Sequence, residues 1–551
     1  MDKCGFYIGA RMGRPEKAKL RKMVGSPHML FPVGSEGGRL RSLQSAIEKG
    51  SVTAQFSLYF CDSCKKETLY RVCECGKRTK ELFFCKLCGK KEESCIHNPA
   101  RYDEKSININ DYVKKARQFL NLENIPDLIK GVKGTSNKNH IPENIAKGML
   151  RAKHDLFVNK DGTIRYDMTE MPMTAFYPRE IGTKIEKLRE LGYEKDVNGN
   201  DLVSENQLVE LKPADLVLPA SEESLNEGSD KILYRVGMFI DELLNKFYKM
   251  DGYYNLKNKS DLIGHLVVGL APHISAGIVG RIIGFSKTQC CFAHPLWHSA
   301  CRRDCEGDEL CIILLMDALL NFSKSFLPAH RGATQDAPLV LTSTLIASEV
   351  DEMAFDLDVA WEYPLEFYEA CLNYKNPREV RIEVLGDRLG KEGQYEGMGF
   401  THDVSDINMG VRCSAYKLLP TMEEKLNGQM NIAEKIRAVD ENDVARLVIE
   451  RHFIRDIRGN LRKFSMQEFR CVKCNNKFRR PPLVGVCGCG GKIIFTVSEG
   501  SVTKYMGLCM ELAKKYSLPG YLRQTIDLTR QRIELVFGKD LEKQEGLGKW
   551  F

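Results

Sequence analysis

Residues 302–322 read RRDCEGDELCIILLMDALLNF, and this stretch decides how the middle of the chain is organised. Asp304, Glu306 and Asp308 alternate with other residues, and a long apolar run follows at once. Like charges at this spacing repel one another unless a cation lies between them. The pattern therefore predicts a cation-binding loop that leads into a buried helix beginning near Leu310.

The chemistry of the loop favours a hard divalent cation. Alternate residues of an extended loop point the same way, so the three carboxylates are expected to converge on one ion. An EF-hand is excluded, because the Gly and Glu it requires at its sixth and twelfth positions are Glu309 and Leu315 here. Carboxylate oxygens without a neighbouring thiolate pair favour Mg²⁺ or Mn²⁺. The alternative is a solvated acidic turn that caps the following helix.

The surroundings of the loop favour metal binding over a capping turn. Arg302 and Arg303 precede it directly, His294 and His298 lie a short distance upstream, and apolar segments flank it on both sides. Arginine forms strong paired hydrogen bonds with phosphate. We therefore expect the three carboxylates to carry metal chemistry and the two arginines to bind phosphate of a substrate or of DNA.

Composition limits the class of protein. The chain has 551 residues, 43% hydrophobic and 28% charged, as in ordinary soluble proteins with several domains. Its best candidate for a membrane span, residues 265–285, is interrupted by Pro272, His273 and Arg281, so no membrane segment is expected. The first residues lack the apolar core of a signal peptide, which predicts a cytoplasmic protein.

Twenty cysteines in a large cytoplasmic chain indicate metal sites rather than disulfides. Three clusters have paired ligand spacing, C-x2-C-x8-C-x-C, C-x2-C-x6-C-x-H and C-x2-C-x12-C-x-C. Closed tetrahedra of this kind are typical of structural Zn²⁺, and up to three such sites are expected. The expected ligands are Cys61, Cys64, Cys73 and Cys75; Cys85, Cys88, Cys95 and His97; and Cys471, Cys474, Cys487 and Cys489.

Zinc binding would change the charge balance. Each four-thiolate site carries −2 and the site with one histidine carries −1, so the formal +7 falls to +2 when all three form. Bases beside the clusters, such as Lys65, Lys86 and Arg479, suit ribbons that lie near phosphate, and equally suit ribbons kept soluble by charge. The alternative for Cys95 and His97 is that their spacing matches a zinc site by chance and that His97 is not a ligand.

Several segments resemble one family. The D-x-E-G-D loop is similar to the metal-binding loop of double-psi β-barrel polymerases. GARMGRPEKA (9–18), APHISAGIVGRIIGF (271–285) and QYEGMGFTHD (394–403) resemble the large subunits of archaeal family-D DNA polymerases. The resemblance runs in order from about Gly5 to Phe551, and it covers only the C-terminal half of such a subunit.

This resemblance implies a mixed α+β multidomain protein with a double-psi β-barrel catalytic core, zinc-ribbon insertions and a C-terminal zinc and helical region. It implies two-metal nucleotidyl transfer from dNTPs to a primer 3′-hydroxyl. The family loop is Asn-x-Asp-Gly-Asp, so Asp304 and Glu306 depart from it, and Glu306 is one methylene longer. Arg14, Lys17 and Lys19 are expected beside the triphosphate, with a general DNA-backbone patch as the alternative.

The resemblance also implies partners. These are primer–template DNA, the N-terminal half of the large subunit, and a small subunit with proofreading 3′–5′ exonuclease that completes a heterodimer. The tail QEGLGKWF is similar to the peptide with which replication proteins hold the sliding clamp, and a frayed end is its alternative. Its expected contact residues are Gln544, Leu547, Trp550 and Phe551.

The expected domain order combines these features. The predicted units are a remainder of a first barrel with the basic motif (1–55), a tandem zinc module (56–105), a helical and α+β connecting region (106–225), a second double-psi barrel with the metal loop (226–420), a C-terminal domain with a ribbon at 471–489 (421–538) and the clamp-binding tail (539–551). A start inside the first barrel suggests a split gene or a fragment. The alternative functions are a non-catalytic, zinc-stapled scaffold on DNA and clamp, and an RNA-polymerase-like enzyme.

Periodicity also predicts elements of the chain upstream of the loop. They are amphipathic helices at 109–122 and 126–134, a strand within 162–168, a charged helix at 179–193 and turn-rich linkers at 196–201 and 220–230.

Overall fold

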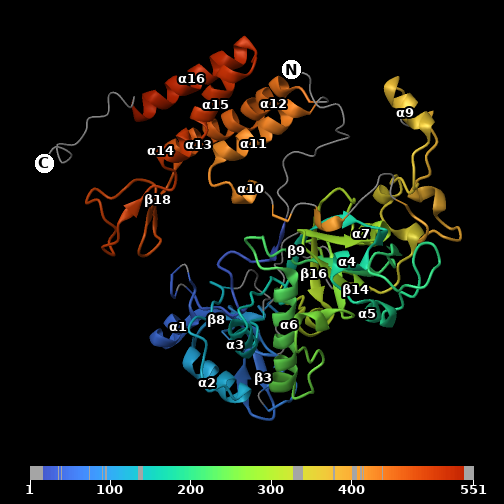
Figure 1. Cartoon of the computed structure of the whole chain (residues 1–551). Coiled ribbons are helices and arrows are strands. Elements are labelled where there is room, and N and C mark those ends of the chain that lie inside the picture. Colours follow the sequence, from blue (N-terminus) through green and yellow to red (C-terminus); the bar gives the residue numbers. More distant parts are fainter. Residues whose placement is uncertain are drawn as a thin grey trace. The chain divides into compact units, whose positions relative to one another are not determined.

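A computed structural model shows two compact units, residues 15–414 and residues 415–551 with 1–14, and each is described here by itself (Figure 1). The described residues are 17–538 with the exception of 35, 39, 74, 90, 93–95, 98, 135–140, 273, 327–338, 377–378, 400–405, 410–411, 414 and 437–438. None of the helices in this described part has the length and apolar character needed to cross a bilayer.

The larger unit contains a closed ring of six strands. The ring runs in the order β9 (Tyr166–Pro172), β15 (Cys290–Ala293), β12 (Asp215–Pro219), β14 (Ala276–Ser286), β13 (Leu266–Leu270) and β16 (Glu309–Leu314), and β16 pairs back with β9. The β9–β15 and β12–β14 pairs are parallel, and the other ring pairs are antiparallel. Outside the ring, β1 (Ala18–Leu20) adds to β9, and β17 (Val340–Thr342) adds to β14. The fold is thus mixed α and β, as expected.

One expectation about the loop's continuation was wrong. Glu309–Leu314 is the strand β16, and the helix α8 begins only at Leu315 and ends at Asn321. The β-branched Ile312 and Ile313 suit a strand, and β16 has ring partners on both sides. A short apolar run buried on both faces has no period that separates strand from helix.

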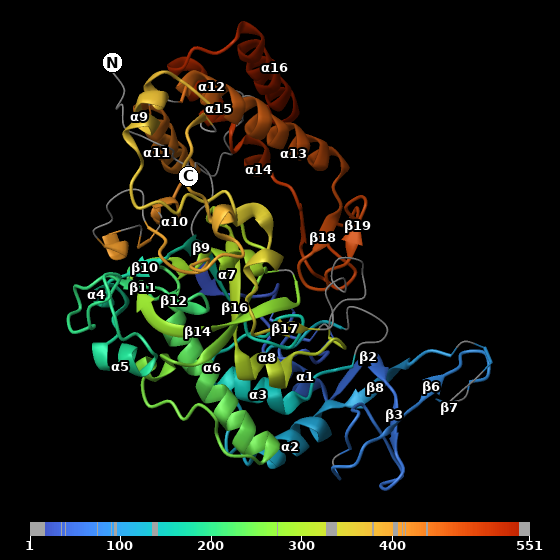
Figure 2. The same cartoon turned by 90° about the vertical axis from the view of Figure 1, so that its right-hand side faces the viewer.

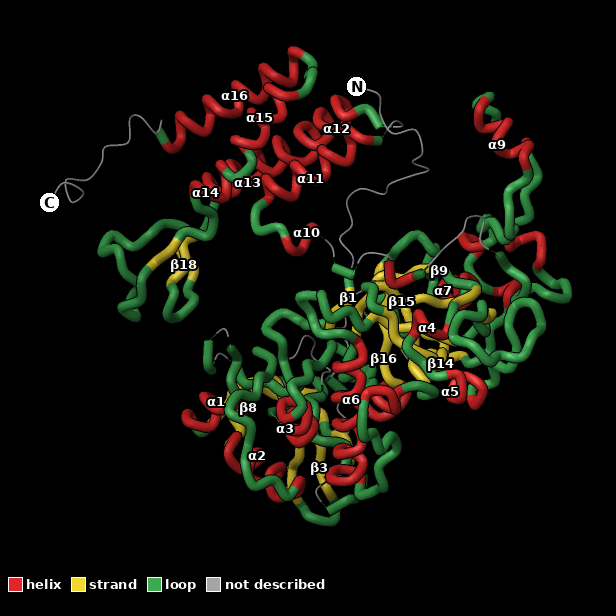
Figure 3. The backbone as a smooth tube through the Cα atoms, viewed as in Figure 1, coloured by secondary structure: helices red, strands yellow, loops and turns green. Residues whose placement is uncertain are grey.

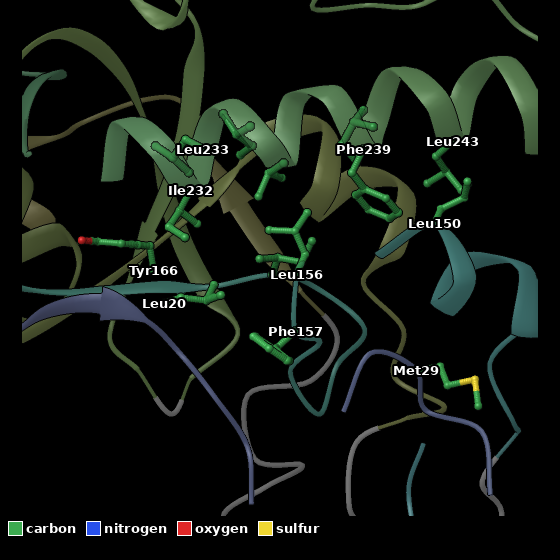
Figure 4. Packing of buried hydrophobic residues seen from close by; sticks show 14 of the residues in the cluster. Leu20, Met29, Leu150, Leu156, Phe157, Tyr166, Ile232, Leu233, Phe239 and Leu243 are labelled. Carbon is green, nitrogen blue, oxygen red and sulfur yellow. The ribbon is translucent and has the colours of Figure 1, made fainter. Parts of the chain in front are cut away.

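The helix α6 (Ser229–Leu243) covers the ring. Ile232, Val236, Phe239 and Leu243 are buried at three- and four-residue spacings, which is the pattern of one helical face. Figure 4 shows this face over Leu156 and Tyr166, with Leu150 of α3 (Ile145–Lys153) close to Leu243. Each such side chain contributes about 1.5–3 kcal/mol when it leaves water, so α6 ties the ring to the residues before it.

Gly269 of β13 carries a prediction about stability. A Cβ at this position would lie 2.1 Å from Cη2 of Trp297, whose indole is buried and donates from Nε1 to the carbonyl of Val279 at 3.2 Å. The indole therefore has little room to move, and overpacking of this kind costs about 1–3 kcal/mol or more. We expect Gly269→Ala to lower the thermal unfolding midpoint clearly, while Gly134→Ala, with nothing within 4 Å, changes it little. An unchanged midpoint for Gly269→Ala would contradict this packing.

The first two cysteine clusters lie on an arm between two long paired strands. β2 (Ser51–Ser57) and β8 (Tyr102–Asn108) pair antiparallel along their whole length. The turns between them carry the cysteines and short strands, and Figure 2 shows these hairpins projecting beyond β2 and β8. The short strands are β3 (Tyr59–Cys61), β4 (Lys66–Thr68), β5 (Lys80–Glu81), β6 (Phe83–Phe84) and β7 (Lys91–Glu92).

Of the helices expected between residues 109 and 193, one is confirmed, one is absent and one is interrupted. The helix expected at 109–122 is α2 (Ile109–Leu120). Residues 126–134 form no helix, because their backbone bonds to residues 28–33 instead, as in the bond from Val132 N to Phe31 O. The charged helix is interrupted at Gly182, which has φ +67° and separates α4 (Pro178–Ile181) from α5 (Ile185–Glu190).

The strand expected within 162–168 begins only at Tyr166, as β9. Residues 196–201 form turns and no helix, as expected, and α6 begins inside the linker expected at 220–230. The ring draws β9 and β12 from residues before 225, so the boundary expected at 225/226 divides the strands of one sheet.

The smaller unit is mostly helical, and within its described residues Figure 3 shows strands only around β18. Its strands β18 (Phe469–Cys471), β19 (Lys477–Phe478) and β20 (Ile493–Ile494) form one three-stranded sheet that carries the third cysteine cluster. Its helices are α10 (Ala415–Leu418), α11 (Met422–Lys435), α12 (Glu441–Leu447), α13 (Ile454–Met466), α14 (Glu499–Thr503), α15 (Met506–Lys515) and α16 (Gly520–Phe537).

Candidate metal centres

The acidic loop joins α7 (Pro295–Ala300) to the ring strand β16. It is a tight turn and not the extended segment that the alternation suggested, because Arg302, Cys305 and Gly307 have φ values of 59°, 60° and 85°. The loop carboxylates accordingly do not gather: in the described part of the chain, only cysteine-containing groups bring three or more ligand atoms within 4.8 Å of one another. Rotation of exposed or partly exposed side chains is needed to bring the carboxylates to one ion.

One of the two arginines contacts the loop. Nη1 of Arg303 lies 3.4 Å from Oδ2 of Asp308 and 3.4 Å from the carbonyl of Glu309. The backbone N–H of Arg303 donates to the carbonyl of His298 at 3.0 Å, which ties the loop to α7. Arg302 is exposed at the turn. Arg303 therefore balances charge on Asp308, and Arg302 faces solvent.

Glu170 of β9 lies against the loop and bonds to its backbone, and the sequence pattern did not reveal this residue. Its Oε1 accepts hydrogen bonds from the N–H groups of Gly307 at 3.1 Å and Asp308 at 3.2 Å. Its own N–H donates to the carbonyl of Asp308 at 2.9 Å. Burial raises the pKa of Glu170 to about 7; the two N–H donors oppose this shift, and the charges of Asp304 and Asp308 add to it.

The two histidines upstream of the loop are buried structural groups. Nε2 of His298 lies 2.9 Å from the carbonyl of Met171, which only accepts, so this nitrogen carries the proton. Burial lowers the pKa of His298 to about 4, and that of His294 also to about 4, so both rings are neutral near pH 7. Nδ1 of His294 accepts from the N–H of Leu296 at 3.2 Å and caps α7.

The basic segment at the start of the described chain reaches the same end of the ring. Lys17 N donates to Oγ1 of Thr169 at 2.9 Å, and the ammonium of Lys17 pairs with Glu309, the residue directly after the acidic loop. Burial alone would raise the pKa of Glu309, but the ion pair with Lys17 holds it below its usual range. Lys19 is exposed on β1, and Arg14 lies outside the described residues.

A second carboxylate lies on β9, two residues along the strand from Thr169. Asp167 accepts from Nη1 of Arg21 at 3.1 Å and is buried. Burial raises the pKa of Asp167 to about 6, although Arg21 opposes that shift. A charged residue in an otherwise buried strand was the available signal for Asp167 and Glu170, but the spacing of a single strand does not show what it faces.

Two four-cysteine clusters have the dimensions of tetrahedral metal sites. Four thiolates bound at 2.3 Å to one Zn²⁺ lie about 3.8 Å from one another. The observed Sγ–Sγ distances are 3.6 Å for Cys61 and Cys75, 3.8 Å for Cys64 and Cys73, 3.5 Å for Cys471 and Cys489, and 3.4 Å for Cys474 and Cys487. Both sets fit structural Zn²⁺.

The second cluster is partly described. Cys85, Cys88 and His97 bring their ligand atoms within 4.8 Å of one another, and Cys88 Sγ lies 3.2 Å from Nδ1 of His97. The geometry therefore places His97 with the two cysteines. Cys95 lies outside the described residues, as do the tail residues Gln544, Leu547, Trp550 and Phe551.

Comparison with known proteins places the chain in a family. A family model described as DNA polymerase II large subunit DP2, catalytic domain, matches residues 122–425, which is more than half of the chain. The chain belongs to the DNA polymerase II large-subunit family. A second model, the DP2 central domain of that large subunit, matches residues 1–94. A third, the zinc finger domain of DNA polymerase-epsilon, matches residues 465–523 and includes the third cysteine cluster.

Relatives within the DNA polymerase II large-subunit family align along nearly the whole chain. The large subunit of Archaeoglobus fulgidus is 48% identical over 98% of this chain and 48% of the relative. That of Nanoarchaeum equitans is 46% identical over 98% and 47%, and that of Pyrococcus furiosus is 47% identical over 96% and 43%. The chain thus spans about half the length of these relatives. The acidic loop, Glu170 and all six ring strands lie inside the catalytic-domain match.

Proposed function

We propose that the chain is the catalytic, C-terminal half of the large subunit of a DNA-directed DNA polymerase. The observation that carries this proposal is the placement of the acidic loop: it lies inside the region that matches the DNA polymerase II catalytic domain, at the end of a ring strand. The ring is proposed to be a double-psi barrel of the kind used by related polymerases. The reaction is template-directed transfer of nucleotides from dNTPs to a primer 3′-hydroxyl.

The donors of the loop suit Mg²⁺ or Mn²⁺. Asp304, Glu306 and Asp308 offer only hard carboxylate oxygens within five residues of a partly exposed turn. Cys305 is half-buried, and burial raises its pKa to well above the usual thiol range, so it stays a neutral thiol. The three carboxylates would hold divalent ions, and these would activate the 3′-hydroxyl and neutralise charge on the leaving pyrophosphate.

The remaining residues of this end of the ring would bind and orient. Arg303 lies against Asp308 and is placed to bind triphosphate when Asp308 turns toward a metal ion. Lys17 is paired with Glu309 beside the loop, so it brings positive charge to the side where β1 meets β9. Exposed Arg302 and Lys19 are proposed to contact DNA or substrate phosphate.

The proposed partners are those that membership of the DNA polymerase II large-subunit family implies. The three cysteine clusters would hold structural zinc in ribbons near DNA or protein. The N-terminal half of the large subunit would complete the enzyme, and a small subunit would supply proofreading 3′–5′ exonuclease. The tail from Gln544 to Phe551 would bind the sliding clamp.

Substitutions of Lys17 and Lys19 test whether this basic segment acts on the triphosphate or forms a general DNA-binding patch. If Lys17 binds triphosphate, Lys17→Met raises the KM for dNTP about tenfold, which corresponds to about 1.4 kcal/mol, and leaves the Kd for primer–template nearly unchanged. Lys19, two residues further on and exposed on β1, is the comparison: if it contacts DNA rather than substrate, Lys19→Met leaves the KM for dNTP nearly unchanged and weakens primer–template binding. Equal weakening of DNA binding by both variants, with a reduced salt dependence, would assign both lysines to the DNA patch.

The proposal is tested by primer extension. This chain is combined with the N-terminal half and the small subunit, and dNTP incorporation is measured on a primed template with Mg²⁺. Template-dependent extension supports the proposal. A complex that assembles and binds primer–template without extending it would favour the scaffold. The longer side chain of Glu306 favours that alternative, because Mg²⁺ requires near-ideal octahedral geometry.

A further inference from the structure

We propose that Glu170 is a positioning residue for the acidic loop: it fixes the backbone turn from which Asp304 and Asp308 reach their metal ions. The inference rests on the proposed function in taking this loop as the divalent-cation site. Glu170 itself is assigned no contact with a metal ion or substrate.

Three hydrogen bonds join Glu170 to the turn. One carboxylate oxygen, Oε1, accepts from the N–H groups of Gly307 and Asp308, and the backbone N–H of Glu170 donates to the carbonyl of Asp308. Both backbone groups of Asp308 are therefore bonded to one residue of β9. The turn needs such support, because Cys305 has φ 60°, a conformation that costs free energy for a residue with a side chain.

Glu170 is itself held rigidly. It is fully buried on β9, opposite Cys291 of β15. The next residue, Met171, accepts at its carbonyl from Nε2 of His298, and the carbonyl of His298 accepts from Arg303 N. Glu170 and His298 thus bond to both ends of the loop, at Asp308 and at Arg303.

The second carboxylate oxygen of Glu170, Oε2, makes no hydrogen bond with the loop, and this allows the role of Oε1 to be tested separately. Glu170 Oε2 and His298 Nδ1 are both buried without a hydrogen-bond partner, and they lie 3.8 Å apart. Because Nε2 of His298 donates to Met171, Nδ1 carries a lone pair that faces Oε2. A glutamine would keep the acceptor toward the loop and turn an amide N–H₂ toward Nδ1. Glu170→Gln therefore preserves the positioning bonds and also pairs the two unpaired atoms.

Metal affinity separates positioning from general stability. Loss of a residue that orients metal ligands typically costs about 10–100-fold in metal affinity. We expect Glu170→Ala to weaken Mn²⁺ binding to the zinc-loaded full chain by about this factor, and Glu170→Gln to stay within about threefold of the parent chain. Electron paramagnetic resonance of free Mn²⁺ during titration measures both values, and thermal unfolding of the same samples measures stability.

A matched control exists in the same unit. Glu180 is also buried and also accepts from two backbone N–H groups, Tyr177 at 2.8 Å and Ile407 at 3.0 Å, but it lies outside the acidic loop's contacts. Glu180→Ala is expected to lower the unfolding midpoint and to leave Mn²⁺ affinity unchanged. Equal loss of Mn²⁺ affinity in both alanine variants would reduce the effect of Glu170 to general stability and overturn the proposal.

Two further outcomes are decisive. Parent-like Mn²⁺ affinity in Glu170→Ala, or an affinity of Glu170→Gln as weak as that expected for alanine, would overturn positioning through the Oε1 acceptor; the glutamine result counts even if the alanine variant does not fold. Unchanged Mn²⁺ binding in Asp308→Asn would instead show that the loop is not the metal site. That last result would refute the proposed function, and it is distinguishable from failure of the Glu170 proposal alone.

Discussion

Asp308→Asn is expected to reduce primer extension by the reconstituted polymerase at least about 1,000-fold, which corresponds to about 4 kcal/mol of transition-state stabilisation. Asp308 is the only loop carboxylate whose backbone N–H and carbonyl both bond to Glu170, so its main chain is the most firmly placed of the three. An amide keeps the shape of the side chain but removes the charge that a divalent ion requires. Steady-state incorporation at saturating dNTP measures the loss.

The substitution has a matched control and a clear opposite outcome. Glu349→Gln removes one negative charge from an exposed position of the same unit and should leave extension unchanged. Primer–template affinity should also stay unchanged in Asp308→Asn, because the loop acts on the reacting groups. Extension within a few-fold of the parent enzyme would mean that the catalytic metal site lies elsewhere.

The second large effect concerns the smaller unit. Cys474→Ser is expected to lower the zinc content by one ion per chain and to unfold the ribbon formed by β18, β19 and β20. This ribbon has short strands and mostly exposed side chains, so it has little apolar core with which to fold alone. A structural Zn²⁺ site supplies about 10–16 kcal/mol at neutral pH, far more than such strands provide.

Zinc analysis and hydrogen exchange check this expectation together. Amides of residues 469–494 should exchange rapidly in Cys474→Ser, while those of α13 and α16 keep their protection because these helices have their own buried core. Cys371→Ser is the control, since Cys371 is exposed and belongs to no cluster in the described part of the chain. Full zinc content in Cys474→Ser would contradict the assignment of this ligand.

Features that depend on local spacing were predictable from the sequence. Paired cysteines three residues apart come together on one turn whatever the rest of the fold does, so the clusters were readable directly. The acidic loop was also visible in the sequence, because its three carboxylates lie within five residues. Its internal geometry was not, because alternation implies a shared direction only in an extended chain, and Cys305 and Gly307 have positive φ.

Features that depend on distant partners were not predictable in this way. Leu310–Leu314 is a strand because β9 and β13 flank it, and those strands lie far away in sequence. Glu170 supports a loop more than 130 residues downstream, and nothing in its own strand indicates that loop. The expected boundary at 225/226 failed to mark a unit because the ring closes through β9 and β12, which precede it.

The most direct test of the metal site proposed at the acidic loop is cleavage of the chain by bound iron. Fe²⁺ replaces Mg²⁺ in the zinc-loaded chain, and ascorbate with peroxide generates hydroxyl radicals that cut the backbone near the bound ion. The predicted cuts lie within residues 304–308 and near Glu170, which contacts that turn, and excess Mg²⁺ suppresses them. Cuts elsewhere in the chain, or cuts at the loop that persist in Asp308→Asn, would contradict a divalent-cation site formed by these carboxylates.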